Sequence, residues 1–301
     1  MIDIHFHCLP GIDDGPRDWD EAVALCRAAL ADGINTIVAT PHVLRDSWLN
    51  EDPAARDSLL AELNSRLGGR PEVLPGCEYF FSSDAVELWE MKSKRYAKPR
   101  RSVKPLQSAA RQPESATAVV SSTSGAPLGS GAPAPAPPSL RLESASRNPK
   151  TGVASPLTGL NGTNHLLIEF PATRLPESAE GVFFELSLIG VIPIIAHPER
   201  NLVFVEQPEK LARLVSLGAR AQITAGSLIG LFGRAAQQAC DDFFTLGLVH
   251  IVASDAHSTR RRPPQLAEAR ELVKKNWGTD AETRLFETNP SLLIQNQPLA
   301  D

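Results

Sequence analysis

Short apolar runs alternate with helix-like stretches seven times along this chain of 301 residues. Each apolar run has the length of a buried strand, and each stretch between them has the spacing of an amphipathic helix. The strands are expected at 2–7, 36–40, 73–77, 166–170, 191–196, 221–224 and 250–254. Seven such units predict an α/β fold, a parallel barrel with seven strands rather than eight. An open doubly wound sheet is the alternative, but the chain lacks the glycine-rich phosphate loop which that fold would place after its first strand.

One long segment does not share this alternation. Residues 92–163 contain 11 Lys or Arg and only 2 Asp or Glu, and they include the run SSTSGAPLGSGAPAPAPPS. Such a composition cannot bury enough apolar surface to offset the entropy lost on ordering. We therefore expect three parts: the first part of the barrel at 1–97, a disordered basic insertion at 98–156, and the second part of the barrel with C-terminal helices at 157–301.

The composition also argues against several classes of protein. The longest apolar stretch, at 188–196, is far shorter than the ~20 residues that cross a bilayer. The N-terminal MIDIHFH does not resemble a secretory signal, so we expect a cytoplasmic protein that is not transmembrane. The four cysteines form neither a CxxC pair nor the C-x5-R loop of thiol-dependent phosphatases. Outside the insertion the chain is acidic, which argues against nucleic-acid binding.

Side chains of metal-binding type follow the expected strands directly. His5 and His7 end the first strand and share one face, because strand side chains alternate in direction. Residues of the same types come at or soon after the ends of expected strands elsewhere in the chain: Asp14, His42, Glu78, His197, Asp255 and His257. Barrel sites form at these carboxyl ends, and burying so many ionisable groups is costly unless ions partner them. The pattern predicts a site for Mn, Fe, Zn or Ni rather than Ca or Mg, with two or three ions sharing a carboxylate.

The segments DIHFHCLPGIDDGP, ATPH, GCE, AHPER and SDAHSTRRRPP together resemble the PHP (polymerase and histidinol phosphatase) superfamily. More narrowly, GIDDGP and the prolines after SDAH resemble the bacterial PHP-type tyrosine phosphatases of capsule and exopolysaccharide operons. The resemblance covers residues 1–91 and 157–275 in the family's order. It implies a distorted (β/α)7 TIM-like barrel, which agrees with the strand pattern.

The resemblance also implies roles for individual residues. It assigns metal binding to eight side chains, with Glu78 as the bridging carboxylate: His5, His7, Asp14, His42, Glu78, His197, Asp255 and His257. The phosphate-contacting arginines of the family match Arg200 and Arg262. The expected cofactor is a cluster of two or three divalent ions, Mn2+ with Fe and Zn as alternatives. The chain departs from the family in its long insertion and in Val43, where the family often has His or Tyr.

Two further polar residues near these motifs have simpler interpretations. Asp13 is expected to be a turn residue or to accept a hydrogen bond from a ligand rather than to bind an ion itself. Glu199 is expected either to orient Arg200 or to pair at the surface.

The function that the resemblance implies is metal-dependent hydrolysis of phosphotyrosine on a protein, with water activated by the ions. The resemblance implies regulation of exopolysaccharide or capsule synthesis, with a bacterial tyrosine kinase of the polysaccharide export machinery as substrate. One alternative is a phosphatase for a small ester, such as histidinol phosphate or a nucleotide. Another is a non-enzymatic scaffold that uses the basic insertion.

The insertion begins with a basic run. Residues 92–104 contain seven Lys or Arg, which is enough for weak attraction to an anionic membrane surface. A solvated linker is the simpler interpretation, and we favour it.

Overall fold

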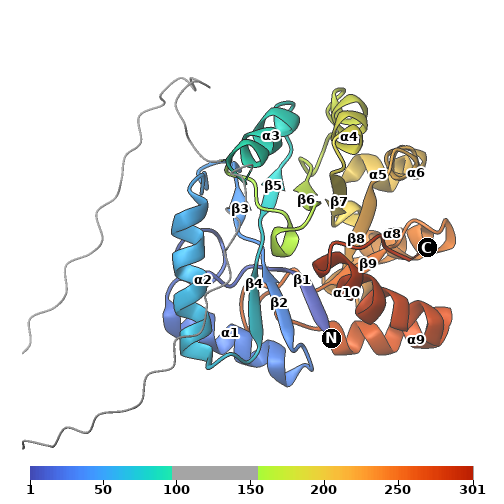
Figure 1. Cartoon of the computed structure of the whole chain (residues 1–301). Coiled ribbons are helices and arrows are strands. Elements are labelled where there is room, and N and C mark those ends of the chain that lie inside the picture. Colours follow the sequence, from blue (N-terminus) through green and yellow to red (C-terminus); the bar gives the residue numbers. More distant parts are fainter. Residues whose placement is uncertain (97–154, 301) are drawn as a thin grey trace, which may run out of the picture. The chain divides into compact units, whose positions relative to one another are not determined.

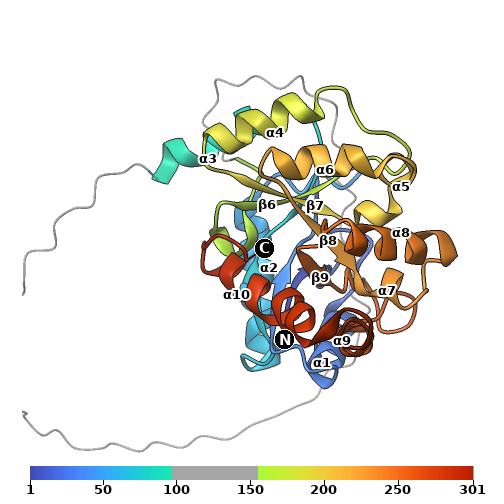
Figure 2. The same ribbon diagram turned by 90° about the vertical axis from the view of Figure 1, so that its right-hand side faces the viewer.

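The computed structural model describes residues 1–96 and 155–300, with side chains for 1–91 and 155–300. In both views of the ribbon, helices lie outside a set of strands (Figures 1 and 2). The strands are β1 Ile2–Phe6, β2 Thr36–Ala39, β3 His42–Val43, β4 Glu72–Pro75, β5 Glu78–Phe80, β6 His165–Glu169, β7 Ile192–Ala196, β8 Arg220–Thr224 and β9 Ile251–Ala253. The expected insertion at 98–156 lies outside the described residues except for Ser155 and Pro156, which are both buried.

The helices follow the expected alternation and add short segments to it. The longer helices are α1 Trp19–Ala31, α2 Pro53–Leu67, α3 Ala85–Tyr96, α4 Ala179–Leu188, α6 Pro208–Ser216, α8 Arg234–Thr245 and α9 Leu266–Thr283. The shorter ones are α5 Leu202–Glu206, α7 Ala225–Leu228, α10 Asn289–Ile294, η1 Leu160–Gly162, η2 Pro198–Arg200 and η3 Arg284–Thr288. Within the described residues, no helix combines the length and apolarity needed to span a bilayer.

Every strand pair is parallel, which confirms the α/β class. One sheet has the order β1-β2-β4, and the other has the order β3-β5-β6-β7-β8-β9. β3 lies just beyond the expected strand at 36–40, and β5 lies just beyond the expected strand at 73–77. β2 and β4 belong to the first sheet and β3 and β5 to the second, so these two stretches of chain pass from one sheet to the other.

Hydrogen bonds also connect the first strand to the last. The Asp255 amide donates to the carbonyl of His5 at 3.0 Å, and the His7 amide donates to the carbonyl of Ala256 at 2.9 Å. The segments at the carboxyl ends of β1 and β9 are therefore hydrogen-bonded to each other, at the residues that carry the polar side chains His5, His7 and Asp255.

Apolar side chains from several strands meet in one buried cluster. Ile4, Val38, Leu167, Ile194 and Ile251 come from β1, β2, β6, β7 and β9. Leu293 and Leu299 of the C-terminal segment complete this cluster. A larger apolar cluster lies between the strands and the outer helices, with Phe183 of α4 and Phe243 of α8 fully buried in it. The strands are thus fixed from both sides, which gives the residues at their ends a rigid base.

Candidate metal centre

Side chains at the carboxyl ends of β1, β7 and β9 and at the first residues of β3 and β5 converge on one place. Glu78, the first residue of β5, lies in the middle. Its Oε1 is 3.0 Å from His197 Nε2 and 3.4 Å from His5 Nε2. Its Oε2 is 2.8 Å from His42 Nδ1 and 3.4 Å from His7 Nε2. One buried carboxylate therefore faces four imidazoles that come from three different strand ends.

Asp255 closes this group on the side of β9. Its Oδ1 is 3.3 Å from His5 Nε2 and 3.7 Å from His7 Nε2. His5 Nε2 and His7 Nε2 are themselves 3.3 Å apart. Both imidazoles thus direct the same kind of nitrogen toward the two carboxylates, as expected for neighbours on one strand face.

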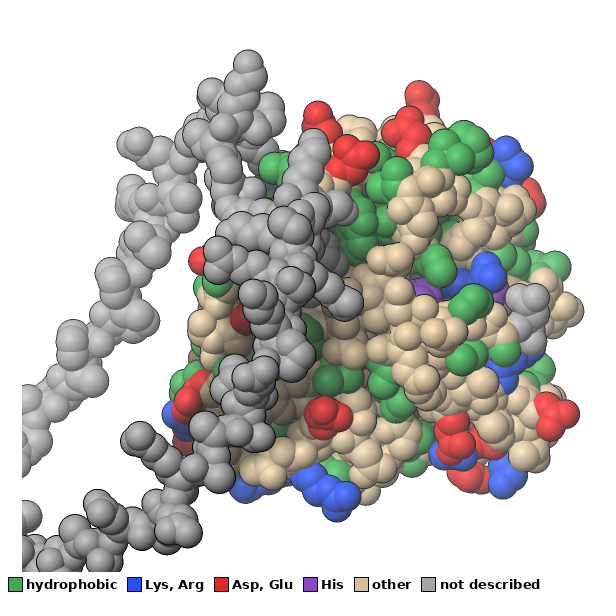
Figure 3. Space-filling model, viewed as in Figure 1, with side chains coloured by type: hydrophobic (Ala, Val, Ile, Leu, Met, Phe, Trp, Pro, Cys, Tyr) green, Lys and Arg blue, Asp and Glu red, His purple; other side chains and the backbone are tan. Residues whose placement is uncertain are grey.

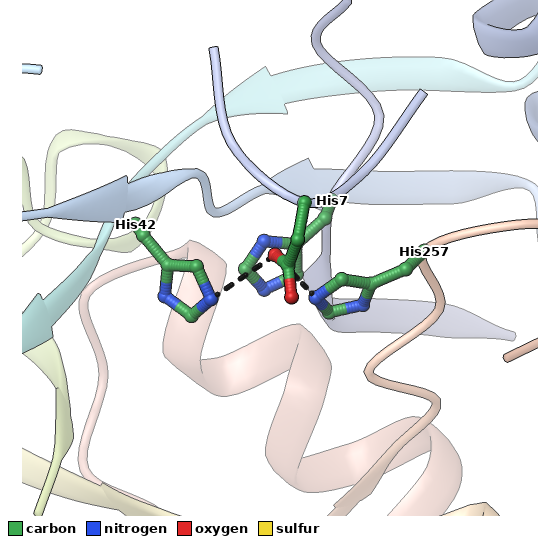
Figure 4. A group of neighbouring side chains, drawn as sticks. His7, His42 and His257 are labelled. Atoms are coloured by element: carbon green, nitrogen blue, oxygen red, sulfur yellow. Dashed lines mark ion pairs between the residues drawn. The ribbon is translucent and has the colours of Figure 1, made fainter. Parts of the chain in front are cut away.

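A second group forms around Asp14, in the turn after β1. Its Oδ1 lies 3.3 Å from His42 Nε2 and 3.1 Å from His257 Nε2. Figure 4 shows the rings of His42, His7 and His257 side by side, with ion pairs from the outer two to a single carboxylate. His7 stacks on His257 with ring centroids 3.8 Å apart. The structure therefore brings together all eight residues that the sequence analysis assigned to metal binding.

Glu169 joins the centre although the sequence analysis did not select it. It is the last residue of β6, and it lies 3.7 Å from His197 and 3.9 Å from His42. We refer to the nine residues together as the Glu78 cluster: His5, His7, Asp14, His42, Glu78, Glu169, His197, Asp255 and His257. The signal for Glu169 was its place at the end of a strand, but the apolar run LIEF was interpreted only as a buried strand.

Hydrogen bonds outside the cluster orient its imidazoles. His5 Nδ1 bonds Gln222 Oε1 at 2.8 Å, and His7 Nδ1 bonds Asp13 Oδ2 at 2.8 Å. In each ring the opposite nitrogen, Nε2, is thereby turned toward the cluster. Such outer partners fix the tautomer and direction of metal-binding histidines. The expectation that Asp13 supports a ligand agrees with this contact.

The backbone at two cluster residues has an uncommon conformation. His197 has φ +33° and Asp255 has φ +54°, both in the left-handed region. Non-glycine residues rarely adopt it, and the cost is tolerated where the surrounding structure enforces it. At both positions the chain leaves a strand and turns its side chain into the Glu78 cluster.

Opposite charges control the pKa values at the centre. Burial lowers the pKa of His5, but the carboxylates of Glu78 and Asp255 outweigh burial and raise it to about 9. Burial raises the pKa of Glu78 and of Asp255, but the facing imidazoles, with His5 foremost, hold both well below their usual range. Without ions, protons on imidazoles thus supply the positive charge that these carboxylates require.

Other members of the cluster favour their neutral forms. Burial lowers the pKa of His197 to about 4, and burial together with the charge of His7 lowers that of His257 to about 4. Burial and the charge of Glu78 raise the pKa of Glu169 to about 8. A neutral imidazole is the form that binds a metal ion, so His197 and His257 need lose no proton to bind one.

The donor set fits divalent ions. Glu78 Oε2 and His257 Nε2 are buried and make no well-directed hydrogen bond to any described residue. Four triads or tetrads of His, Asp and Glu in the cluster have ligand atoms within 4.8 Å of one another. Imidazole nitrogens mixed with carboxylate oxygens suit transition metals. Cations placed among them would satisfy lone pairs that otherwise face each other.

Two arginines approach the centre beside Asp255. Arg200 Nη1 donates to Asp255 Oδ2 at 2.8 Å, and Arg262 Nη2 donates to the same oxygen. Arg200 also lies 4.6 Å over the ring of Phe232. Neither arginine is fully buried. The face seen in Figure 3 shows little histidine surface, and Lys or Arg side chains lie beside it.

Glu199 adopts neither of the roles expected for it. It is buried, and its Oε1 accepts hydrogen bonds from the Thr224 amide and the Ser227 hydroxyl. It therefore joins η2 to the end of β8 rather than directing Arg200 or pairing at the surface.

Comparison with known proteins gives consistent matches over nearly the whole chain. The model of the CpsB/CapC family of capsular polysaccharide synthesis matches residues 1–103 and 153–295. The tyrosine-protein phosphatase YwqE of Bacillus subtilis (strain 168) is 33% identical, over 99% of this chain and 93% of YwqE. The putative tyrosine-protein phosphatase CapC of Staphylococcus aureus is 29% identical, over 100% of this chain and 93% of CapC.

Among solved structures, this chain is similar to one from the crystal structures of YwqE from Bacillus subtilis and CpsB from Streptococcus pneumoniae. Those proteins are described as unique metal-dependent tyrosine phosphatases. The similarity has a TM-score of 0.76 at 33% identity, and it covers 100% of this chain and 96% of the other.

Proposed function

This chain belongs to the CpsB/CapC family of capsular polysaccharide synthesis, and from that premise we propose that it is a metal-dependent protein-tyrosine phosphatase acting at the Glu78 cluster. The observation that carries the proposal is the convergence of four imidazoles on one buried carboxylate, Glu78. A role in regulating capsule or exopolysaccharide synthesis follows from the same membership.

The proposed ligands are the eight residues named from the sequence, together with Glu169. Glu78 is the proposed bridge, because each of its oxygens faces two imidazoles. Nine candidate side chains exceed the needs of one ion, so we propose two or three divalent ions. Mn2+ suits this mixture of nitrogen and carboxylate donors, with Fe and Zn as alternatives. Bound ions would lower the pKa of a water molecule and neutralise developing charge on a phosphoryl group.

Arg200 and Arg262 are the proposed phosphate-binding residues. Both guanidinium groups reach Asp255 Oδ2, at the edge of the cluster. Arginine stays protonated and cannot bind a metal ion, but its planar fork matches two oxygens of a phosphoryl group. Asp255 and the ring of Phe232 hold Arg200 before substrate arrives, so little ordering is needed on binding.

The proposed substrate is phosphotyrosine on a protein, and the proposed partner is a bacterial tyrosine kinase of the polysaccharide export machinery. A cytoplasmic location remains a prediction from the sequence. The alternative substrates are small phosphate esters such as histidinol phosphate or a nucleotide. A panel of phosphotyrosine peptides and small esters at matched concentrations would separate the two substrate classes by kcat/KM.

Metal analysis combined with activity tests this proposal. Purified protein should contain bound transition metal, lose p-nitrophenyl phosphate hydrolysis on chelation, and regain it on addition of Mn2+. His5→Ala and Asp255→Ala should lower both metal content and activity, because each removes a ligand. Cys8→Ser and Cys77→Ser are matched controls next to His7 and Glu78. Full activity in chelated protein, or in either ligand variant, would contradict the proposal.

A further inference from the structure

Arg45 is a cation at the centre that none of the assigned roles uses. It lies in a tight turn between β3 and α2. Its amide donates to the carbonyl of Trp48 at 3.2 Å, and the Trp48 amide donates back at 2.8 Å. Leu44 and Asp46, on either side, have φ +59° and +47°. Non-glycine residues keep this left-handed backbone only where surrounding contacts enforce it, and here the two backbone hydrogen bonds between Arg45 and Trp48 close the turn.

The guanidinium of Arg45 contacts two members of the Glu78 cluster. Its Nη1 lies 2.8 Å from His42 Nε2 and forms an ion pair with Glu169 Oε2 at 3.0 Å. The group also lies 6.0 Å from the ring centroids of Trp48 and Phe80. Arg45 therefore places a fixed positive charge directly on two side chains that would bind ions.

These contacts cannot persist when an ion binds His42. The same Nη1 is 2.8 Å from Nε2 and 3.4 Å from Nδ1, so an ion on either nitrogen would meet the guanidinium at short range. Arginine cannot give up its proton, and two cations so close repel each other. Loading of His42 with an ion thus requires the Arg45 guanidinium to leave that ring.

The surroundings of Arg45 indicate where its charge can act after that. Arg45 and Arg200 line one hollow beside the cluster, together with His197, Asn201 and Phe204. Arg200 and Arg262 both contact Asp255, whereas Arg45 contacts His42 and Glu169. A phosphoryl group has three equatorial oxygens, and an arginine held by different cluster residues adds donors that the two arginines at Asp255 do not supply.

We propose that Arg45 is a third phosphate-binding arginine, which holds His42 and Glu169 in the ion-free centre and binds the substrate phosphoryl group when ions are present. This inference rests on the proposed phosphatase function. The simpler account makes Arg45 only a counter-ion for Glu169. The two accounts differ in whether its removal weakens the binding of phosphate.

The first measurement is the inhibition constant for inorganic phosphate. Each variant is saturated with Mn2+, and the substrate is p-nitrophenyl phosphate. Arg45→Ala should raise the inhibition constant for phosphate by about tenfold or more, because a charge-assisted contact is lost. Arg45→Lys should keep part of the affinity as a point charge. Arg66→Ala is the matched control, since Arg66 also lies over a tryptophan and pairs with a glutamate, Trp19 and Glu62, outside the Glu78 cluster.

The second measurement is the affinity of ion-free protein for Mn2+ alone, determined by a calorimetric titration. Arg45→Ala should bind Mn2+ more tightly than the parent, because a cation that competes for His42 is gone. Arg66→Ala should match the parent in both measurements. Circular dichroism and the melting temperature of each variant report whether it folds. If Arg45→Ala does not fold, Arg45→Lys is used to measure phosphate inhibition instead.

The outcomes separate the inference from the function on which it rests. Weaker phosphate inhibition together with tighter Mn2+ binding supports it. An unchanged inhibition constant in a folded, active variant overturns it and leaves the counter-ion account. Weaker Mn2+ binding also overturns it, because Arg45 would then support the ion site. A parent protein without metal-dependent hydrolysis would instead refute the proposed function.

Discussion

Asp255 uses its two oxygens for two different kinds of partner. Oδ1 faces His5 and His7, and Oδ2 accepts from Arg200 and Arg262. A carboxylate placed in this way can bind an ion on one side and hold two guanidinium groups at the edge of the ion site on the other. The arrangement couples the proposed ligands to the proposed phosphate-binding residues through a single side chain.

This division of roles predicts the behaviour of the two arginine variants. Arg200→Ala and Arg262→Ala should keep the parental metal content but lose about 10²- to 10³-fold in turnover, because each removes one preorganised donor. Lysine at either position should restore little, since it lacks the planar fork. Kinetics and metal quantification on the same preparations test this, with Arg213→Ala as the control, because Arg213 pairs with Glu180 at the surface. Parental rates in both alanine variants would make these arginines bystanders.

The metal centre leaves no space for a side chain at Gly15. A Cβ added there would lie 2.8 Å from the His7 carbonyl oxygen and 3.0 Å from Asp13 Oδ1. The backbone oxygen cannot move without shifting His7, so the turn that carries Asp14 would have to change. The glycine in GIDDGP is therefore explained by close approach to a cluster residue.

Gly15→Ala should consequently disturb both stability and metal binding. We expect a loss of about 1–3 kcal/mol in the free energy of unfolding, as for other overpacked sites, together with reduced metal content. Gly181→Ala in α4 is the control, because a Cβ there meets nothing within 4 Å and alanine favours helix by ~1 kcal/mol. Denaturant unfolding of both variants with metal analysis checks the pair. A Gly15→Ala protein as stable and metal-loaded as the parent would contradict this account.

At the scale of elements, the sequence predicted most strands because buried parallel strands are short apolar runs that end at turn residues. It did not predict β3 and β5, which follow short breaks after β2 and β4. The second break contains Gly76, where a Cβ would lie 2.8 Å from Val38 Cγ1. That close approach between neighbouring strands is a tertiary contact, which no local pattern contains.

The same limit applies to the site. Eight cluster residues could be named because they follow strands and match family motifs that are local in the sequence. Glu169 and Arg45 acquire meaning only through His42 and His197, which other strands supply. Side chains whose partners are distant in the chain belong to no local sequence pattern, so only the structure could identify them.

Because the cluster draws on the ends of six strands, bound ions should stabilise the fold as well as support the chemistry. Mn2+ at about 100 times its dissociation constant would add ~2.7 kcal/mol to the free energy of unfolding. We expect this to raise the melting temperature of chelated protein by about 5 °C or more. His5→Ala should show a smaller rise. Calorimetric scans with and without Mn2+ test this, and equal melting temperatures for the parent would refute it.

At the scale of the whole molecule, the described residues on both sides of the expected insertion contribute to one centre. Glu78 comes before it, and His197 and Asp255 come after it. The last residue of the expected insertion and the chain just after it are anchored, because Arg56 Nη2 donates to the Pro156 carbonyl at 2.7 Å and to Thr158 Oγ1 at 3.0 Å. Cys77, next to Glu78, also bonds the backbone of Thr158.

These contacts set the limits of a deletion that should preserve the enzyme. Replacing residues 100–152 by a short Gly-Ser linker should leave a folded protein with parental metal content and activity, because every proposed ligand and arginine lies outside that range. Extending the deletion through Thr158 should destabilise the protein, since Arg56 Nη2 would then lose its two partners while the side chain stays buried and keeps only its Nη1 bond to the Asn50 carbonyl. Melting temperature, metal content and p-nitrophenyl phosphate hydrolysis compare the two deletions. A soluble, metal-loaded first variant without activity would mean that the segment itself completes the site, and the proposed roles of Arg200 and Arg262 would then be insufficient.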